Sequence, residues 1–426
     1  MSFDWQTEDK AGWDDPVSPP PDKPPQWRRW WWAVAGVVLL LLVTAVLTRA
    51  LQQRLESVTG ELEAEVLASY TVIEAAAVRG DGEVVASFLS GRDNAWATAV
   101  TQMAANGGVY QRDGLGLTWL ENQPPASPTM TFAPDLQSAE VSKAVAYAID
   151  VGNGVTETVV LTQTAVYRSG DNRWLLAPPD ADFWGDSRTV SGQYLSVQYP
   201  TRDADLARRL FLNLDDKLGQ MCSQLPNFSC PNDFAVSLML STEPGTLAGA
   251  NLPAVLANSP AALTLPTPTL VGIPQTESGY QALFRGYASL VLASAITDIV
   301  EWRCCEQAVF YQAVLSELLR QLSLQPETLT AVQFDVLWQS NASLTEGAHL
   351  WALTEAADSW LAVAIVAMAQ DVWGQTAVSL IYSLADDPPP NFGDWLHELA
   401  GPDRTNEELL ATWAAYVNGR LSQPGT

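Results

Sequence analysis

The sequence predicts an α+β protein that is anchored in a membrane by one N-terminal helix. Nineteen consecutive residues, 30–48, carry no charge. Helical patterns then continue to about residue 105, strand-like alternation follows in 141–177, and the C-terminal half is mostly helical. Helices followed by an antiparallel sheet are the layout of an α+β domain.

The uncharged stretch is long enough to cross a bilayer. At the rise of an α-helix it reaches roughly 28 Å, which is close to the hydrocarbon thickness. Three tryptophans at 30–32 lie where an aromatic belt is expected, and Arg28-Arg29 lies just outside it. We therefore expect a transmembrane helix over 28–49 that contacts the lipid bilayer through residues 30–48. A buried core helix is the alternative, but few such helices lack charge over this length.

The basic residues around this helix favour one orientation. Lys23, Arg28 and Arg29 precede the span. Arg49 and Arg54 follow it. The positive-inside rule then places the N-terminus in the cytoplasm. We expect a single-pass protein of the cell membrane with an extracytoplasmic body.

The composition limits the partners of that body. The chain holds 22 Lys and Arg against 48 Asp and Glu, a formal net charge of −26. Because phosphate binding needs clustered basic residues, we expect no nucleic-acid partner. An acidic surface mostly serves solubility. The 47% apolar residues, with 17 tryptophans, are enough to fill the cores of two ordinary domains.

Four cysteines, Cys222, Cys230, Cys304 and Cys305, allow three pairings. Disulfides persist outside the cell, and a Cys222–Cys230 bond would close a short loop, so this pair is the candidate disulfide. Adjacent Cys304-Cys305 seldom bond to each other because the ring is strained. Free thiols and a zinc site remain alternatives, although no C-x₂-C spacing is present.

Two segments flank the membrane helix. Residues 1–27 are rich in Pro and Asp, which predicts a disordered cytoplasmic tail or, as the alternative, a docking peptide. Residues 50–62 are expected to form a stalk helix, and a homodimer along it is left open. Its apolar residues recur at helical spacing: Leu51, Leu55, Val58 and Leu62.

Residues 63–186 change from helical to strand-like periodicity. The first helix is expected to end at the glycine-rich Arg79-Gly80-Asp81-Gly82. The other expected elements are helices at 83–89 and 93–105 and strands at 141–149, 158–167 and 173–177, with a hairpin turn at 152–154.

The helices of Tyr70–Leu89 and the ending Val166–Gly185 resemble the NTF2-like (SnoaL, cystatin-like) fold. The resemblance implies a conical pocket between sheet and helices, used by enzymes, for small ligands or for protein contact. Enzymatic members place His and acid pairs there. Residues 63–186 contain no histidine, so a binding or structural use is favoured.

Residues 192–422 predict a second body. An amphipathic helix is expected at 203–222, a loop at 242–262, and an extended proline-rich segment at 263–273 that belongs at a sheet edge. The remaining expected elements are strands at 194–199 and 234–240 and helices over 280–322, 344–385 and 393–420.

This order of elements resembles the gluzincin metallopeptidases, the thermolysin-related peptidase MA-like group. The segments that show this resemblance are Trp360–Met368, Val372-Trp373-Gly374-Gln375 and Asn406–Val417. The family binds zinc through H-E-x-x-H on one helix. The corresponding helix, Tyr280–Val300, contains neither His nor Glu. The resemblance therefore implies a degenerate peptidase domain.

The chain has only two histidines, and they lie on different segments. His397-Glu398 imitates half of the zinc motif, but Gly401-Pro402 ends that helix. We interpret His349 and His397 as ordinary helix-face residues. We expect no enzyme activity, no cofactor, and no catalytic or metal-ligating residues.

A vestigial cleft is expected where the peptidase site would lie, at Arg285, Gly286, Tyr287 and Ser289. The hypothesis is a non-catalytic binding module for an unknown protein, peptide or small ligand. A structural subunit of a membrane assembly and a hydrolase with a non-metal carboxylate site are the alternatives. Six aromatic residues either line this cleft or fill the core: Tyr280, Trp302, Tyr311, Trp338, Trp351 and Trp360.

Overall fold

The structure is a computed structural model, and it describes residues 26–121, 127–152, 155–257, 262–303, 307–325, 329, 331–340, 343–355, 359–386 and 388–421. It divides into two compact units, one ending at Ala64 and one running from Glu65. Most of the predicted tail, the turn residues Asn153-Gly154, and Cys304-Cys305 lie outside the described residues.

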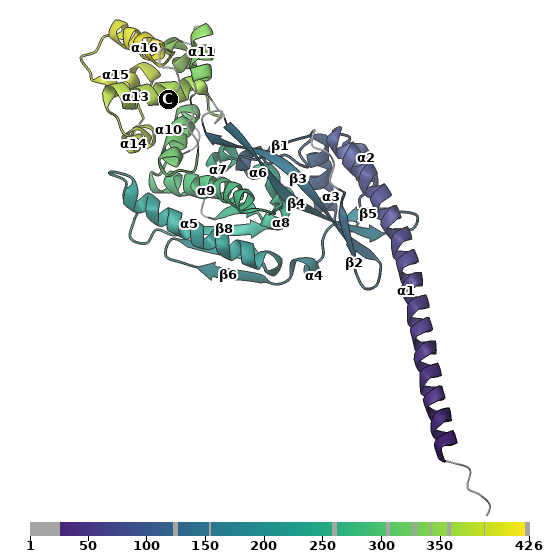
Figure 1. Cartoon of the computed structure of the whole chain (residues 1–426). Coiled ribbons are helices and arrows are strands. Elements are labelled where there is room, and N and C mark those ends of the chain that lie inside the picture. The colour runs from purple at the N-terminus through teal and green to yellow at the C-terminus, as the bar shows by residue number, and fades with distance from the viewer. Residues whose placement is uncertain are drawn as a thin grey trace, which may run out of the picture. The chain divides into compact units, whose positions relative to one another are not determined.

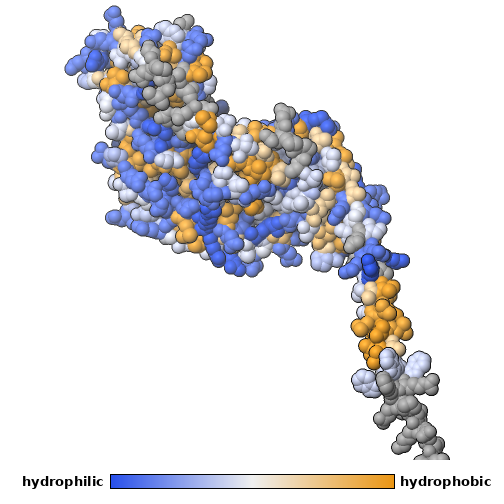
Figure 2. All heavy atoms as spheres, in the orientation of Figure 1, coloured by the Kyte–Doolittle hydropathy of each residue, from blue (hydrophilic) through white to orange (hydrophobic). Residues whose placement is uncertain are grey.

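The first described element is one long helix, α1 (Gln26–Val78). Its apolar part is exposed to its surroundings and forms a continuous hydrophobic band (Figure 2). Among the described residues, two helices are long and apolar enough to cross a membrane, α1 and α9 (Glu277–Ile299). Because most residues of α9 are buried inside the protein, it is a core helix. The N-terminal apolar helix therefore exists as the sequence predicts.

A curled antiparallel sheet follows, as the strand pattern predicts (Figure 1). Before it come α2 (Gly82–Ser87) and α3 (Asn94–Ala105), whose first turns are capped by the side chains of Asp81 and Asp93. The sheet's members are β1 (Thr118–Trp119), β2 (Thr129–Phe132), β3 (Ser138–Gly152), β4 (Val155–Ser169), β5 (Trp174–Ala177) and β10 (Ile273–Pro274). The paired strands β3 and β4 form most of it.

A second sheet has the order β6-β7-β8-β9, and α5 (Ala204–Gln224) packs on it (Figure 1). Its strands are β6 (Ser187–Ser191), β7 (Leu195–Pro200), β8 (Val236–Ser241) and β9 (Leu263–Pro266). The predicted stripe of α5 is buried at Leu210, Leu214 and Leu218. The strand β9 lies at the sheet edge, as its prolines predict. The short helix α4 (Ala181–Trp184) precedes this sheet.

Two sequence predictions in this region are wrong. The predicted loop 242–262 contains α6 (Thr246–Gly249) and α7 (Leu252–Ala257), because the side chain of Asn251 caps the start of α7. The segment 263–273 is not extended throughout. It is interrupted by α8 (Pro268–Val271), which has proline in its first turn, a position where the fixed φ of proline favours a helix.

The rest of the chain is helical and packs around buried aromatic rings. Phe310 lies 5.2 Å from Trp395 and 5.6 Å from Trp351, centroid to centroid. The helices are α9, α10 (Ala308–Gln321), α11 (Ala331–Gln339), α12 (Leu344–Trp351), α13 (Trp360–Trp373), α14 (Ala377–Ala385), α15 (Phe392–Ala400) and α16 (Asn406–Leu421). The α+β class with a helical C-terminal half is therefore confirmed.

Several contacts join the stretches before and after residue 190 within the second unit, and two of them involve β10 and Arg112. The strand β10 pairs with β4, with Ile273 opposite Thr162. The buried guanidinium of Arg112 donates to the carbonyls of Val271 and Leu270, each at 3.1 Å. It also donates to the carbonyls of Val109 and Gln111 and to the amide of Gln163. Burial lowers the pKa of Arg112 from its ordinary value.

We expect Arg112→Met to lower the free energy of unfolding by about 3 kcal/mol, because it leaves several buried carbonyls without a donor. The measurement is urea denaturation of the detergent-solubilised full chain, followed by tryptophan fluorescence. Arg208→Met on the exposed face of α5 is the matched control and should stay within about 0.5 kcal/mol of wild type. An unchanged midpoint for Arg112→Met would show that this network is dispensable.

Candidate functional site

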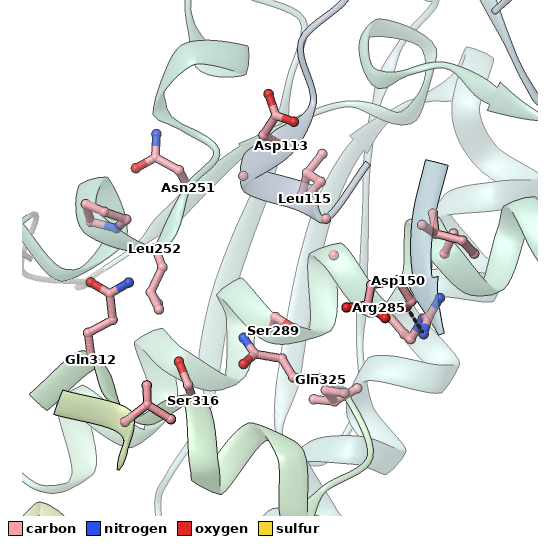
Figure 3. Close-up of a pocket in the computed structure, with 18 of the residues that line it drawn as sticks. Asp113, Leu115, Asp150, Asn251, Leu252, Arg285, Ser289, Gln312, Ser316 and Gln325 are labelled. Carbon is pink, nitrogen blue, oxygen red and sulfur yellow. Dashed lines mark hydrogen bonds between the residues drawn. The ribbon is translucent and has the colours of Figure 1, made fainter. Parts of the chain in front are cut away.

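A cavity of about 590 Å³ lies beside α9 in the second unit (Figure 3). One wall is the short 3₁₀ turn η1 (Asp113–Leu115) and another is the start of α7. The end of β3, the helix α10 and the first turn of α13 complete the lining. The site is therefore assembled from segments that are far apart in the sequence.

The helix α9 presents one stripe of residues to this cavity. Ala282, Arg285, Gly286 and Ser289 all line it, and their spacing places them on one face of a helix. Three of these belong to the predicted vestigial cleft. The fourth predicted residue, Tyr287, is fully buried and its hydroxyl donates to the carbonyl of Pro266 at 2.5 Å. Tyr287 therefore belongs to the core beneath the helix.

Two glycines allow η1 to form the wall. An ideal Cβ on Gly286 would lie 2.5 Å from the carbonyl oxygen of Leu115. A Cβ on Gly114 would overlap the carbonyl oxygen of Ala250. Since both approaches involve backbone atoms, η1 is held tightly between α9 and the segment before α7.

A second cavity of about 510 Å³ lies beside the same turn. It is lined by α3 and by the segment from Gly245 to Asn251. Four residues line both cavities: Asp113, Gly114, Leu115 and Asn251. A single stretch of backbone at η1 thus borders both spaces.

Several polar groups of the cleft are already engaged within the protein. Figure 3 shows Arg285 beside Asp150, whose backbone carbonyl accepts from the guanidinium at 3.4 Å. The carboxylate of Asp150 accepts from the amide of Gly152 at 2.7 Å. Asn251 accepts from Ala254 at the start of α7. These bonds fix the positions of the side chains.

Four other polar side chains of the lining hydrogen-bond no residue that the structure describes. They come from η1, α9, α10 and the segment after α10, and Figure 3 shows them around the same space. They are Asp113, Ser289, Ser316 and Gln325. Because polar groups in a protein normally find a partner, these four are available to a ligand or to water.

The six candidate aromatic residues divide between core and surface. Tyr280, Trp302, Tyr311 and Trp351 are buried. Trp360 is 45% exposed and lines the cleft in the first turn of α13, where Ser359 caps the helix by accepting from Ala362. Trp338 is 48% exposed on α11 and lines none of the described cavities.

The two histidines are not brought together at the cleft. His349 lies on α12, and His397 lies on α15 with its Nε2 2.9 Å from Asn406. Within the residues that the structure describes, no group of three His, Cys, Asp or Glu side chains could hold a metal ion. Cys222 and Cys230 form a disulfide that joins the end of α5 to the loop after it.

A second group of titratable residues lies between α1 and the first sheet. Lys143 pairs with Glu74, which also accepts from the hydroxyl of Tyr110 at 3.2 Å. Burial raises the pKa of Tyr110 and of Tyr167 in this group. The group contains one carboxylate, whereas the hydrolase alternative needs two that converge. We assign it a structural role between helix and sheet.

In comparisons with known proteins, no protein-family model, curated protein or solved structure matches this chain. The NTF2-like and gluzincin resemblances therefore stay predictions.

We expect Gly286→Ala to lower the free energy of unfolding by about 1–3 kcal/mol, because the new methyl group collides with the backbone of η1. Urea denaturation of the full chain measures this change. Gly419→Ala on α16 is the matched control, since its added Cβ meets no atom within 4 Å. That variant should be unchanged or more stable by less than about 1 kcal/mol. Equal stability of both variants would mean that η1 is not pressed against α9.

Proposed function

We propose that this chain is a membrane-anchored, extracytoplasmic binding module that holds a ligand in the cleft beside α9 without cleaving it. The supporting observation is an open cavity lined by polar side chains that hydrogen-bond no described residue. The ligand is a peptide, a small molecule or a segment of a partner protein.

The size and lining of the cleft support this proposal. Ligand pockets usually measure about 300–1,000 Å³, and a volume of about 590 Å³ lies within that range. Apolar side chains such as Leu115, Leu252 and Val363 share the lining with hydroxyl and amide groups. Such a mixture supplies apolar contact area together with a few groups that set orientation.

The face of α9 supports binding over hydrolysis. In the gluzincin resemblance this face would carry the zinc ligands and the general base. Here it carries Ala282, Arg285, Gly286 and Ser289. None of these side chains is an ordinary zinc ligand or general base, and the small Ala282 and Ser289 leave volume for an occupant. On this proposal, the chain derives from a peptidase that lost its zinc ligands and kept its cleft.

The anchor supports a place at the cell surface. The apolar part of α1 is long enough to span a bilayer, and the basic residues before it favour a cytoplasmic N-terminus. A disulfide between Cys222 and Cys230 agrees with an oxidising compartment for the body.

A structural role in a membrane assembly is the second candidate. Beyond the apolar span, α1 exposes Val58, Leu67 and Val72, each at least 40% accessible. Exposed apolar residues on one helix favour pairing with another helix. A homodimer along α1 would be compatible with ligand binding in the cleft.

We expect Ser289→Trp to abolish ligand binding, because the indole would occupy the cleft next to Arg285. The probes are capped tetrapeptides and neutral tetrasaccharides, titrated against the full chain in nanodiscs and followed by ligand-observed NMR. Ser316→Trp should do the same from α10. Ser223→Trp, on the exposed end of α5, is the matched control and should bind as wild type does.

Two outcomes would contradict the proposal. Binding that persists in both cleft variants, or no binding by either probe class, would remove the cleft as a ligand site. One tightly bound Zn²⁺ per purified chain, with chelator-sensitive peptide cleavage, would show that the protein is a metallopeptidase.

For topology, we expect Glu63→Cys on the exposed face of α1 to react with a membrane-impermeant maleimide on intact cells. The positive-inside bias places this residue outside. Ser18→Cys in the N-terminal segment should react only after permeabilisation, and the wild-type chain controls for its native cysteines. The reverse labelling pattern would invert the orientation.

A further inference from the structure

We propose that the cleft beside α9 binds a neutral oligosaccharide, which stacks on Trp360 and donates and accepts hydrogen bonds at Ser289, Ser316 and Gln325. This inference rests on the proposed binding function and names the chemical class of the ligand. It follows from the aromatic group, the polar groups and the charge of the lining.

Trp360 supplies a surface for stacking. Large aromatic side chains are usually mostly buried, yet this one is 45% exposed and lines the cavity. Its backbone is fixed because Ser359 caps the first turn of α13. A sugar ring has an apolar face of C–H groups and a rim of hydroxyls. An indole ring can cover such a face while its edge stays in water.

The partnerless polar groups of the lining match the rim of a sugar. A serine hydroxyl both donates and accepts, and a glutamine amide does the same through two different atoms. Ser289, Ser316 and Gln325 come from three separate segments around one space, and none hydrogen-bonds a described residue. Sugar hydroxyls also donate and accept, so they can satisfy all three side chains.

The charges of the lining disfavour an anionic ligand. Asp113 and Asp150 are both carboxylates, and Arg285 donates a hydrogen bond to the backbone carbonyl of Asp150. The chain as a whole carries a net charge of −26. An anionic ligand would enter against this field, whereas a neutral one enters without that cost.

The backbone of the cleft disfavours an extended peptide. Peptides that bind by strand addition need an unpaired sheet edge that offers a row of N–H and C=O groups. Among the described lining residues, only Ile149 and Asp150 belong to a strand, and two residues are too few to offer such a row. The other lining residues come from helices and loops.

The test compares two tryptophans with nearly equal exposure. The full chain in nanodiscs is titrated with chitotetraose, cellotetraose and maltotetraose, and in parallel with capped tetrapeptides of Ala, Ser and Gly. We expect at least one tetrasaccharide to bind and Trp360→Ala to weaken it about tenfold or more. Trp360→Phe should retain most of the affinity, because a phenyl ring still stacks. Trp338→Ala on α11 should leave binding unchanged.

The possible results distinguish failure of the saccharide proposal from failure of the proposed binding function. Peptide binding that is lost in Ser289→Trp, with no tetrasaccharide bound, would overturn the saccharide class and leave the binding function standing. If Trp360→Ala leaves tetrasaccharide binding unchanged, the proposed stacking on Trp360 would be overturned. No binding of either class would overturn both proposals.

Discussion

The arrangement of the second unit depends on a buried arginine that bonds to carbonyls. Arg112 is 5% exposed, and its guanidinium reaches from the segment after α3 to the backbone of Leu270 and Val271. A buried cation is costly unless its donors are satisfied. Arg112 meets this condition with backbone and amide oxygens, so the two parts of the chain must be present together for the charge to be accommodated. The next residue begins η1, so the same anchor positions the wall of the cleft.

The helix α9 connects this anchor to the proposed function. One side of it packs on the core, where Tyr287 bonds to the carbonyl of Pro266. Its other side touches η1 at Gly286 and opens to the cavity at Arg285 and Ser289. The helix therefore has structural contacts on both sides and the proposed binding role on the cavity side only. The small Ala282 and Ser289 leave volume in the cavity that bulkier side chains would fill.

Much of this arrangement is visible in the sequence, because local periodicity encodes it. The leucine stripe of α5, the paired strands β3 and β4, and the apolar helix α9 all follow from spacing alone. The order of helices and strands was enough to predict a cleft at Arg285, Gly286 and Ser289. The disulfide pair Cys222–Cys230 could be named only as a candidate, because it closes a short loop.

The rest of the site depends on contacts between distant segments, which periodicity does not encode. Nothing in the local sequence shows that Gly114 packs against the backbone of Ala250, since glycines in turns are common. The two-residue strand β10 is too short to show alternation. Whether Trp360 is buried in the core or exposed in the cleft depends on which distant residues cover it. The sequence alone therefore leaves both alternatives open.

The turn η1 has a consequence for energetics as well as shape. All three of its residues line both cavities, together with Asn251. An occupant on one side and an occupant on the other would press on the same atoms. Two ligands that both displaced this partition would be thermodynamically linked, and each would change the affinity of the other by an identical factor.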